Sequence, residues 1–148
     1  MLSIQGDDYF MKQALVEAQK AYDADEVPVG AVVVYDGKII ARAHNQTELL
    51  NDVTAHAEIL AITAASDYIG SKYLKKCTLY VTLEPCNMCA GALYWSQMSR
   101  VVYGAADDKR GFMVMGREML HPKTRIEYGI LNIQCSDILK KYFSNKRS

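Results

Sequence analysis

Three candidate metal ligands in two separate segments constrain the fold of this chain more than any other feature. His56 lies in the segment 54–58, which also carries Glu58, and Cys86 and Cys89 lie in the segment 83–89. One imidazole and two thiolates can bind a single metal ion only if the fold brings these two segments together. The set is one ligand short of a closed structural zinc site, and catalytic zinc sites leave that fourth position to water.

Glu58 gives this arrangement a chemical function. Zinc prefers nitrogen and sulfur ligands, and it lowers the pKa of a bound water to about 7. A carboxylate that is not itself a ligand can accept the proton of that water and pass it to a substrate. The sequence therefore predicts a zinc-dependent hydrolase in which His56, Cys86 and Cys89 bind zinc and Glu58 is the catalytic acid–base.

Hydrophobic periodicity and turn residues divide the chain into alternating helices and strands. Asp7 or Asp8 is expected to cap the first helix, Thr54 the second, and Pro85 to lie in the first turn of the third. The expected elements are helix 8–24, strands 29–35 and 38–43, a helix from Thr54 to 66, strand 76–83, a helix beginning near Pro85, strand 101–103, strand 125–128 and helix 131–143. Residues 104–124 are expected to be a long loop of the kind that is often functional.

This order of elements predicts a single α/β domain over residues 1–148, with three layers (α/β/α) and a mixed central sheet. A chain of 148 residues, half of them hydrophobic, is large enough for one ordinary core. Cys86 and Cys89 fall in the first turn of one helix, and His56 begins another. Two helix N-termini are thus expected to meet at the metal, where their dipoles stabilise thiolate. His56 and Glu58 are two residues apart and can share a site only at the start of their helix.

The sequence predicts a cytoplasmic protein without a membrane segment. Residues 1–8 lack the basic and apolar regions of a secretory signal, and no apolar run approaches the roughly 18 residues of a membrane span. Cys77 and Cys135, the two cysteines outside the ligand set, are expected to be core residues in a reducing compartment.

Cationic and anionic residues are equal in number, 17 each, which argues against a strongly basic nucleic-acid-binding protein. The end of the chain nevertheless carries a run of cations that is either a local basic patch or a solvated helix end. These cations are Lys140, Lys141, Lys146 and Arg147.

The spacing H-x-E…P-C-x-x-C is the signature of the zinc deaminases, and from Val27 onward the chain resembles the bacterial tRNA adenosine deaminases. The matching stretches are 27–32, 54–58, 77–91 and 100–105, and the basic closing helix is also similar. The resemblance implies a cytidine-deaminase-like α/β/α fold, one zinc ion per subunit and a homodimer. It implies conversion of the wobble adenosine of a tRNA anticodon stem-loop to inosine.

The same resemblance implies a set of substrate contacts. Asn45 would hydrogen-bond the flipped nucleoside, and the backbone of Ala57 would help to orient the base. Val29 and Leu83 would be among the apolar walls of the site, and Asp107 would meet the anticodon loop.

Two departures from the family pattern keep other substrates open. The loop 109–116 is shorter than in the tRNA enzymes and lacks their glycine-serine-leucine-methionine step. Tyr94-Trp95 is similar to a helix of the guanine deaminases, so deamination of a free purine base or nucleoside is the alternative. Trp95 itself is otherwise expected to be a core residue. A third interpretation is a non-catalytic, zinc-stabilised RNA-binding domain whose fourth ligand is His44, Cys77 or Cys135.

Overall fold

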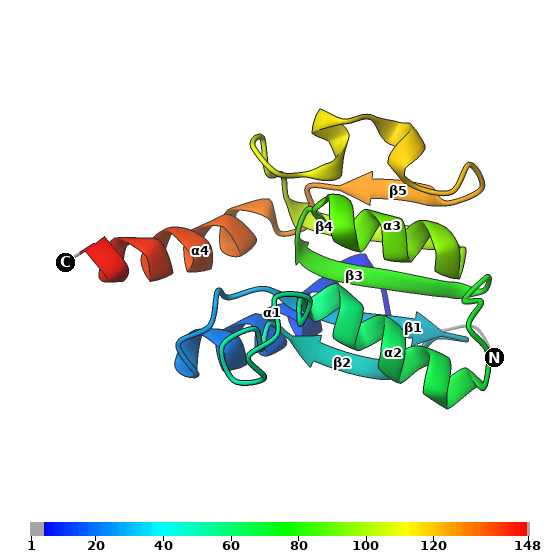
Figure 1. The fold of residues 1–148 in the computed structure, drawn as a ribbon, viewed down its shortest axis with the longest axis horizontal. Coiled ribbons are helices and arrows are strands. Elements are labelled where there is room, and N and C mark those ends of the chain that lie inside the picture. The colour runs from blue at the N-terminus through cyan, green and yellow to red at the C-terminus, as the bar shows by residue number, and fades with distance from the viewer. Residues whose placement is uncertain (1–4, 148) are drawn as a thin grey trace.

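The strands of this protein form one mixed sheet in the order β2-β1-β3-β4-β5 (Figure 1). The computed structural model describes residues 5–147, so part of the stretch in which no secretory signal is expected, residues 1–4, lies outside it. The strands are β1 (Gly30–Tyr35), β2 (Lys38–His44), β3 (Cys77–Leu83), β4 (Arg100–Ala105) and β5 (Arg125–Tyr128). β1 pairs antiparallel with β2 and β3, whereas the pairs β3–β4 and β4–β5 are parallel, which confirms the mixed sheet.

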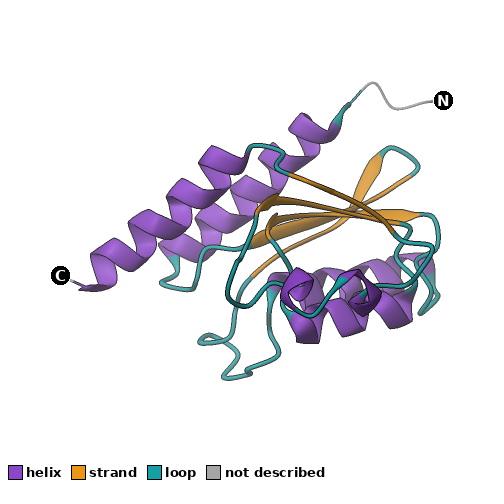
Figure 2. Ribbon diagram, turned by 90° about the horizontal axis from the view of Figure 1, so that it is seen from above, coloured by secondary structure: helices purple, strands orange, loops and turns teal. Residues whose placement is uncertain are grey.

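Two helices cover each face of the sheet (Figure 2). The helices are α1 (Asp7–Asp23), α2 (Ala57–Ile69), α3 (Asn87–Ser96) and α4 (Asn132–Arg147). α2 and α3 contribute small side chains such as Ala61 and Ala90 to the core on one face, so both helices lie close to the sheet. α1 and α4 pack on the other face through Phe10, Met11 and Cys135. The predicted three-layer architecture is confirmed.

α1 begins one position earlier than expected. Gly6 is the N-cap, and Asp7 and Asp8 lie in the first turn, where their charges favour the helix dipole. α1 also lies unusually close to β1, because a Cβ on Gly30 would overlap the backbone of Ala14. Only glycine can occupy that point of contact between helix and strand.

The two helices that bear the ligands also begin at residues other than those expected. Thr54 does not cap α2: its N–H and hydroxyl both donate to Asp52 Oδ1, each at 2.8 Å, and His56 is the N-cap. Pro85 precedes α3 rather than lying in its first turn, because Cys86 is the N-cap. Each helix therefore starts at a candidate ligand.

The expected turns and loops are largely as predicted. Asp36 and Gly37 both have positive φ, 52° and 74°, as the type I′ turn of a two-residue hairpin requires. The long loop contains two short 3₁₀ turns, η1 (Phe112–Val114) and η2 (Arg117–Met119). Within residues 5–147, no helix is both long and apolar enough to span a bilayer.

Candidate active site

The three predicted metal ligands converge where α2 and α3 begin. Nδ1 of His56 lies 3.7 Å from Sγ of Cys86 and 3.5 Å from Sγ of Cys89, and all three ligand atoms lie within 4.8 Å of one another. A tetrahedral zinc ion with ordinary bond lengths, about 2.3 Å to sulfur and 2.0 Å to nitrogen, places nitrogen and sulfur about 3.5 Å apart. The observed spacing therefore fits a zinc-sized ion between them.

Cys86 is the more acidic of the two thiols. Its hydrogen bonds with Cys89 and His56 lower the pKa of Cys86 to about 3. The hydrogen bond with Cys86 raises the pKa of Cys89, and the neighbouring Cys86 also raises the pKa of His56. Thiolate is the form of cysteine that binds a metal, so the electrostatics of the group favour a bound cation.

A closed four-ligand site finds no support among the described residues. The group contains no fourth histidine, cysteine or carboxylate within residues 5–147. Nδ1 of His44 lies 3.5 Å from the carboxylate of Glu17 instead. Cys77 is buried in the core, and Cys135 packs against the opposite face of the sheet, as expected of core residues.

Glu58 lies beside the ligand group without belonging to it. It is the second residue of α2, and its side chain is buried. Burial raises the pKa of Glu58 to about 7, although a hydrogen bond from its own backbone N–H opposes the shift. A carboxyl group that titrates near neutral pH can both accept and donate a proton.

Asn45 joins the end of β2 to the start of α2. Its Oδ1 accepts the N–H of Ala57 at 2.7 Å, and its own backbone N–H donates to the carbonyl of Val29 at 3.1 Å. With its carbonyl oxygen engaged, the side-chain amide nitrogen is the group that can donate to a ligand. The N–H of Ala57 is used within the protein, so that group is not available to orient a base.

Val29 immediately precedes β1, and Leu83 is the last residue of β3, three residues before Cys86. Val29 is buried, and Leu83 is half-buried at the wall of a cavity of about 310 Å³ beside α4. The cavity is lined by Leu83, Ala105, Ala106, Ser136, Leu139, Lys140, Phe143 and Ser144. It therefore extends from a predicted wall of the site to the closing helix.

The cations of α4 have different surroundings. Lys140 lines the cavity. Lys141 lies over the ring of Tyr22, and Lys146 forms an ion pair with Asp25 at 2.6 Å. Lys141 and Lys146 therefore connect α4 to the end of α1, whereas Lys140 shares its cavity with Leu83.

Asp107 lies beyond β4 and is not part of the ligand group. Its Oδ1 accepts the backbone N–H groups of Lys109 and Arg110, at 3.1 and 3.0 Å. Its carboxylate is thus engaged in the turn of its own loop.

Two buried carboxylates beside the site were not singled out from the sequence. Glu26 accepts the backbone N–H groups of Glu48 and Leu49, at 3.0 and 2.8 Å, and so anchors the loop after Asn45. Glu84 anchors the loop after β4 in a similar way. Their position in the sequence could have pointed to these two residues. Glu26 adjoins the stretch 27–32 and Glu84 lies within the stretch 77–91, both of which match the family.

Trp95 is not a core residue, contrary to expectation. Its side chain is 77% exposed, and its ring contacts Tyr94. Nine residues of helix, about 13 Å, separate it from Cys86. The Tyr94-Trp95 pair therefore lies at the far end of α3 from the ligand group.

Comparisons with known proteins agree with this geometry. The family model for MafB19-like deaminase matches residues 5–147. The tRNA-specific adenosine deaminase of Aquifex aeolicus (strain VF5) is 44% identical over 148 residues, which cover 97% of each chain. A solved structure from a study of A-to-I editing by tRNA:A34 deaminases at the wobble position of transfer RNA has a TM-score of 0.83 at 44% identity. It covers 88% of this chain and 99% of the other.

A guanine deaminase structure is similar over a smaller part of the chain. The Bacillus subtilis protein has a TM-score of 0.66 at 41% identity and covers 69% of this chain and 66% of its own. The tRNA-specific relative thus combines 44% identity with coverage of 97% of this chain, whereas the Bacillus subtilis guanine deaminase structure covers 69% of it.

Proposed function

Because the chain belongs to the MafB19-like deaminase family and matches tRNA-specific adenosine deaminases over nearly its full length, we propose that it deaminates the wobble adenosine of a tRNA anticodon to inosine. The observation that carries the proposal is the three-ligand group with Glu58 buried beside it. That arrangement suits hydrolysis of an amidine C–N bond, which adenine presents at C6.

His56, Cys86 and Cys89 would hold one zinc ion per subunit. Their chemistry and their nitrogen–sulfur distances fit that ion. When bound, zinc supplies a water of lowered pKa and hence a nucleophile at neutral pH.

Glu58 would handle the protons of the reaction. It would accept a proton from water as the water adds to C6 of the adenine and pass it to the ring nitrogen. It would then take the remaining proton of the added hydroxyl and pass it to the amino group, which leaves as ammonia as the C6–N bond breaks and the C6=O bond forms. The amide nitrogen of Asn45 would donate to the nucleoside, and Val29 and Leu83 would form apolar walls. Because the N–H of Ala57 is bonded to Asn45, any contact of the Ala57 backbone with the base would have to come from another group.

The cavity beside α4 supports an RNA substrate over a free base. It shares Leu83 with the predicted base site and adds the cation of Lys140 and the ring of Phe143. A cation can bind a phosphate, and an aromatic ring can stack on a neighbouring base. An RNA substrate offers both groups, whereas free guanine has neither a phosphate nor a neighbouring base. Asp107, in the loop that follows β4, would meet the anticodon loop.

Deamination of free guanine is the second candidate, favoured by the sequence Tyr94-Trp95. The exposure of Trp95 and its distance along α3 from Cys86 weaken that argument. Similarity to the guanine deaminase structure supports shared chemistry more than a shared substrate.

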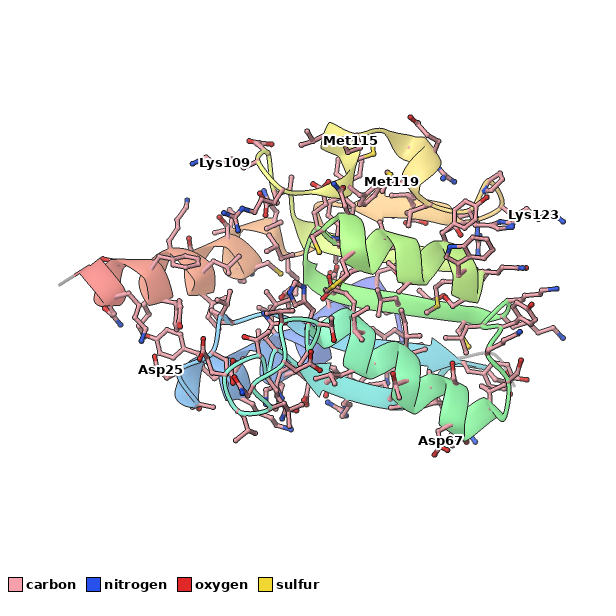
Figure 3. The ribbon with its side chains drawn as sticks, in the orientation of Figure 1. Asp25, Asp67, Lys109, Met115, Met119 and Lys123 are labelled. Atoms are coloured by element: carbon pink, nitrogen blue, oxygen red, sulfur yellow. The ribbon has the colours of Figure 1, made fainter. Side chains whose placement is uncertain are left out.

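A homodimer in the cytoplasm is part of the proposal. Exposed apolar side chains gather on η1, at the residue that follows it and at the adjacent start of α3, and they suit an interface with a second copy. They are Met88, Met113, Val114 and Met115, and Figure 3 shows Met115 at the outer edge of the molecule. A cytoplasmic location suits the two free thiols of the ligand group.

A side-by-side deamination assay tests the function. The zinc-loaded protein is given an anticodon stem-loop with a wobble adenosine, and separately guanine, adenosine and cytidine. Inosine in the stem-loop, with the small substrates unchanged, is the expected result. Ammonia from guanine alone would overturn the proposal in favour of the second candidate. Cys86→Ala is the control, and it is expected to lose both bound zinc and activity.

A further inference from the structure

The loop that follows β4 is attached to the ligand-bearing segment by one side chain, Glu84. Oε1 of Glu84 accepts the backbone N–H of Asp107 at 3.0 Å, and Oε2 accepts that of Met113 at 3.0 Å. The two bonds hold residues 107–113 at both ends. Glu84 is buried and lies two residues before Cys86, yet it is not among the candidate ligands.

Backbone contacts bring the same loop alongside the start of α3. The N–H of Phe112 donates to the carbonyl of Pro85 at 2.9 Å, and Gly111 forms an isolated bridge with Cys86. The Phe112 side chain is fully buried. A Cβ on Gly111 would overlap the Glu84 carboxylate, so the loop is shaped to receive that group.

A carboxylate suits this position better than any other side chain. Both of its oxygens accept hydrogen bonds, and bonds from N–H groups to a buried charged acceptor are among the stronger ones in proteins. Glutamine of the same shape would turn an N–H₂ group toward one of the two backbone N–H groups. Glu84→Gln therefore removes one anchor while preserving volume.

The anchored loop presents two cations at the carboxyl end of β4. Lys109 and Arg110 are exposed, and the Asp107 side chain fixes their backbone through the two bonds described above. Figure 3 shows Lys109 projecting from the tip of this loop. Their position relative to the ligand group thus depends on Glu84.

We propose that Glu84 is a positioning residue for the RNA substrate: it fixes residues 107–113 so that Lys109 and Arg110 meet the phosphate backbone beside the reacting nucleotide. The proposal rests on the function proposed above. Glu84 holds the loop through the two backbone N–H groups and is not in the candidate ligand group, so on this proposal it acts on substrate binding rather than on the chemical step.

Steady-state kinetics of stem-loop deamination at several salt concentrations test this role. Glu84→Gln is expected to raise KM about fivefold, the equivalent of one hydrogen bond, with kcat and zinc content unchanged. The slope of log(kcat/KM) against log[salt] should become shallower by roughly 0.7 for each phosphate that the variant no longer neutralises. Amide hydrogen exchange should accelerate at Asp107 and Met113.

A surface variant keeps the test decisive if Glu84→Gln folds poorly. The double variant Lys109→Gln/Arg110→Gln alters only exposed side chains and is expected to reproduce the rise in KM and the shallower slope. Glu118→Gln removes an exposed carboxylate from the same long loop and is the matched control, with the parameters of the wild type expected.

Three results would overturn the proposal. In the first, the lysine–arginine double variant keeps the wild-type KM and salt slope. In the second, Glu84→Gln lowers kcat or zinc content at unchanged KM, which would indicate a purely structural role. In the third, the wild type itself fails to act on the stem-loop, and the proposed function is then wrong as well. Either of the first two results would overturn only the role proposed for Glu84.

Discussion

At the scale of single residues, the site depends on which side chain begins each helix. His56 and Cys86 are both N-caps, so their side chains project from helix ends where backbone N–H groups favour negative charge. Glu58 lies in the first turn of α2 with its side chain buried, and this burial raises the pKa of Glu58 to about 7. The candidate metal ligands His56 and Cys86 thus lie at helix caps, and the proposed proton-transfer residue, Glu58, lies in the first turn of α2.

Glu58→Gln should separate these two tasks. The amide keeps the shape of the side chain but cannot accept the proton, so kcat is expected to fall at least about 10²-fold. Zinc content should stay at the wild-type level, and the melting temperature should not fall, because burying a neutral amide avoids the cost of a buried charge. Metal analysis, calorimetry and the stem-loop assay measure the three quantities. Activity within about tenfold of the wild type would contradict the assigned role.

The residues of the site could be predicted to different degrees. The ligands and Glu58 follow from residue type and spacing, because zinc chemistry restricts both. The exposure of Trp95 could not be predicted, because position in a helix does not tell which of its faces lacks a neighbour. The engagement of the Ala57 N–H by Asn45 also depends on a contact between segments that the sequence separates.

At the scale of elements, a polar cluster holds the start of α1 against β3 and β4. The Asp7 carboxylate forms a 2.7 Å ion pair with Arg100, and it accepts the Tyr80 hydroxyl at 2.6 Å. Arg100 also pairs with Glu127 of β5 at 2.7 Å. The hydrogen bond from Arg100 is the main reason that the pKa of Asp7 lies below its ordinary value of 3.8.

Asp7→Asn should therefore change how stability depends on acid. A carboxyl whose pKa is lower in the folded state stabilises the protein above its unfolded pKa, and the contribution is lost as pH falls through the folded pKa. Urea unfolding is expected to show the variant less stable than the wild type at pH 7, with a smaller difference below pH 3.8. An equal difference at both pH values would contradict this account.

Element boundaries were less predictable than element types. Periodicity predicts four helices and five strands because each pattern reports a buried face. Starts of helices were misplaced where local polar bonds intervene, as at Thr54, which bonds to Asp52 instead of capping α2. The order of strands in the sheet and the two turns η1 and η2 depend on long-range packing that no local pattern reports.

At the scale of the whole molecule, the exposed apolar group on η1 and α3 predicts the oligomeric state. Met115→Glu is expected to shift a dimer toward monomer, because a carboxylate in an apolar interface must be desolvated. Sedimentation velocity at several concentrations measures the shift. Val16→Glu, an equivalent change at an exposed apolar side chain of α1 on the opposite face of the sheet, should leave the dimer intact. A dimer that is unaffected by Met115→Glu would place the interface elsewhere.

The parallel pairing of β3 and β4 has a practical consequence for joining this protein to another. Asp7 contacts Arg100, the first residue of β4, whereas Cys86 follows the other end of β3. A partner domain fused ahead of α1 would thus be attached near the start of β4, at the end of the sheet opposite the candidate metal ligands. A domain fused after α4 would instead extend a helix that lines the cavity beside Leu83. Tethering the enzyme by its amino end should leave the approach to the site open to a bulky substrate.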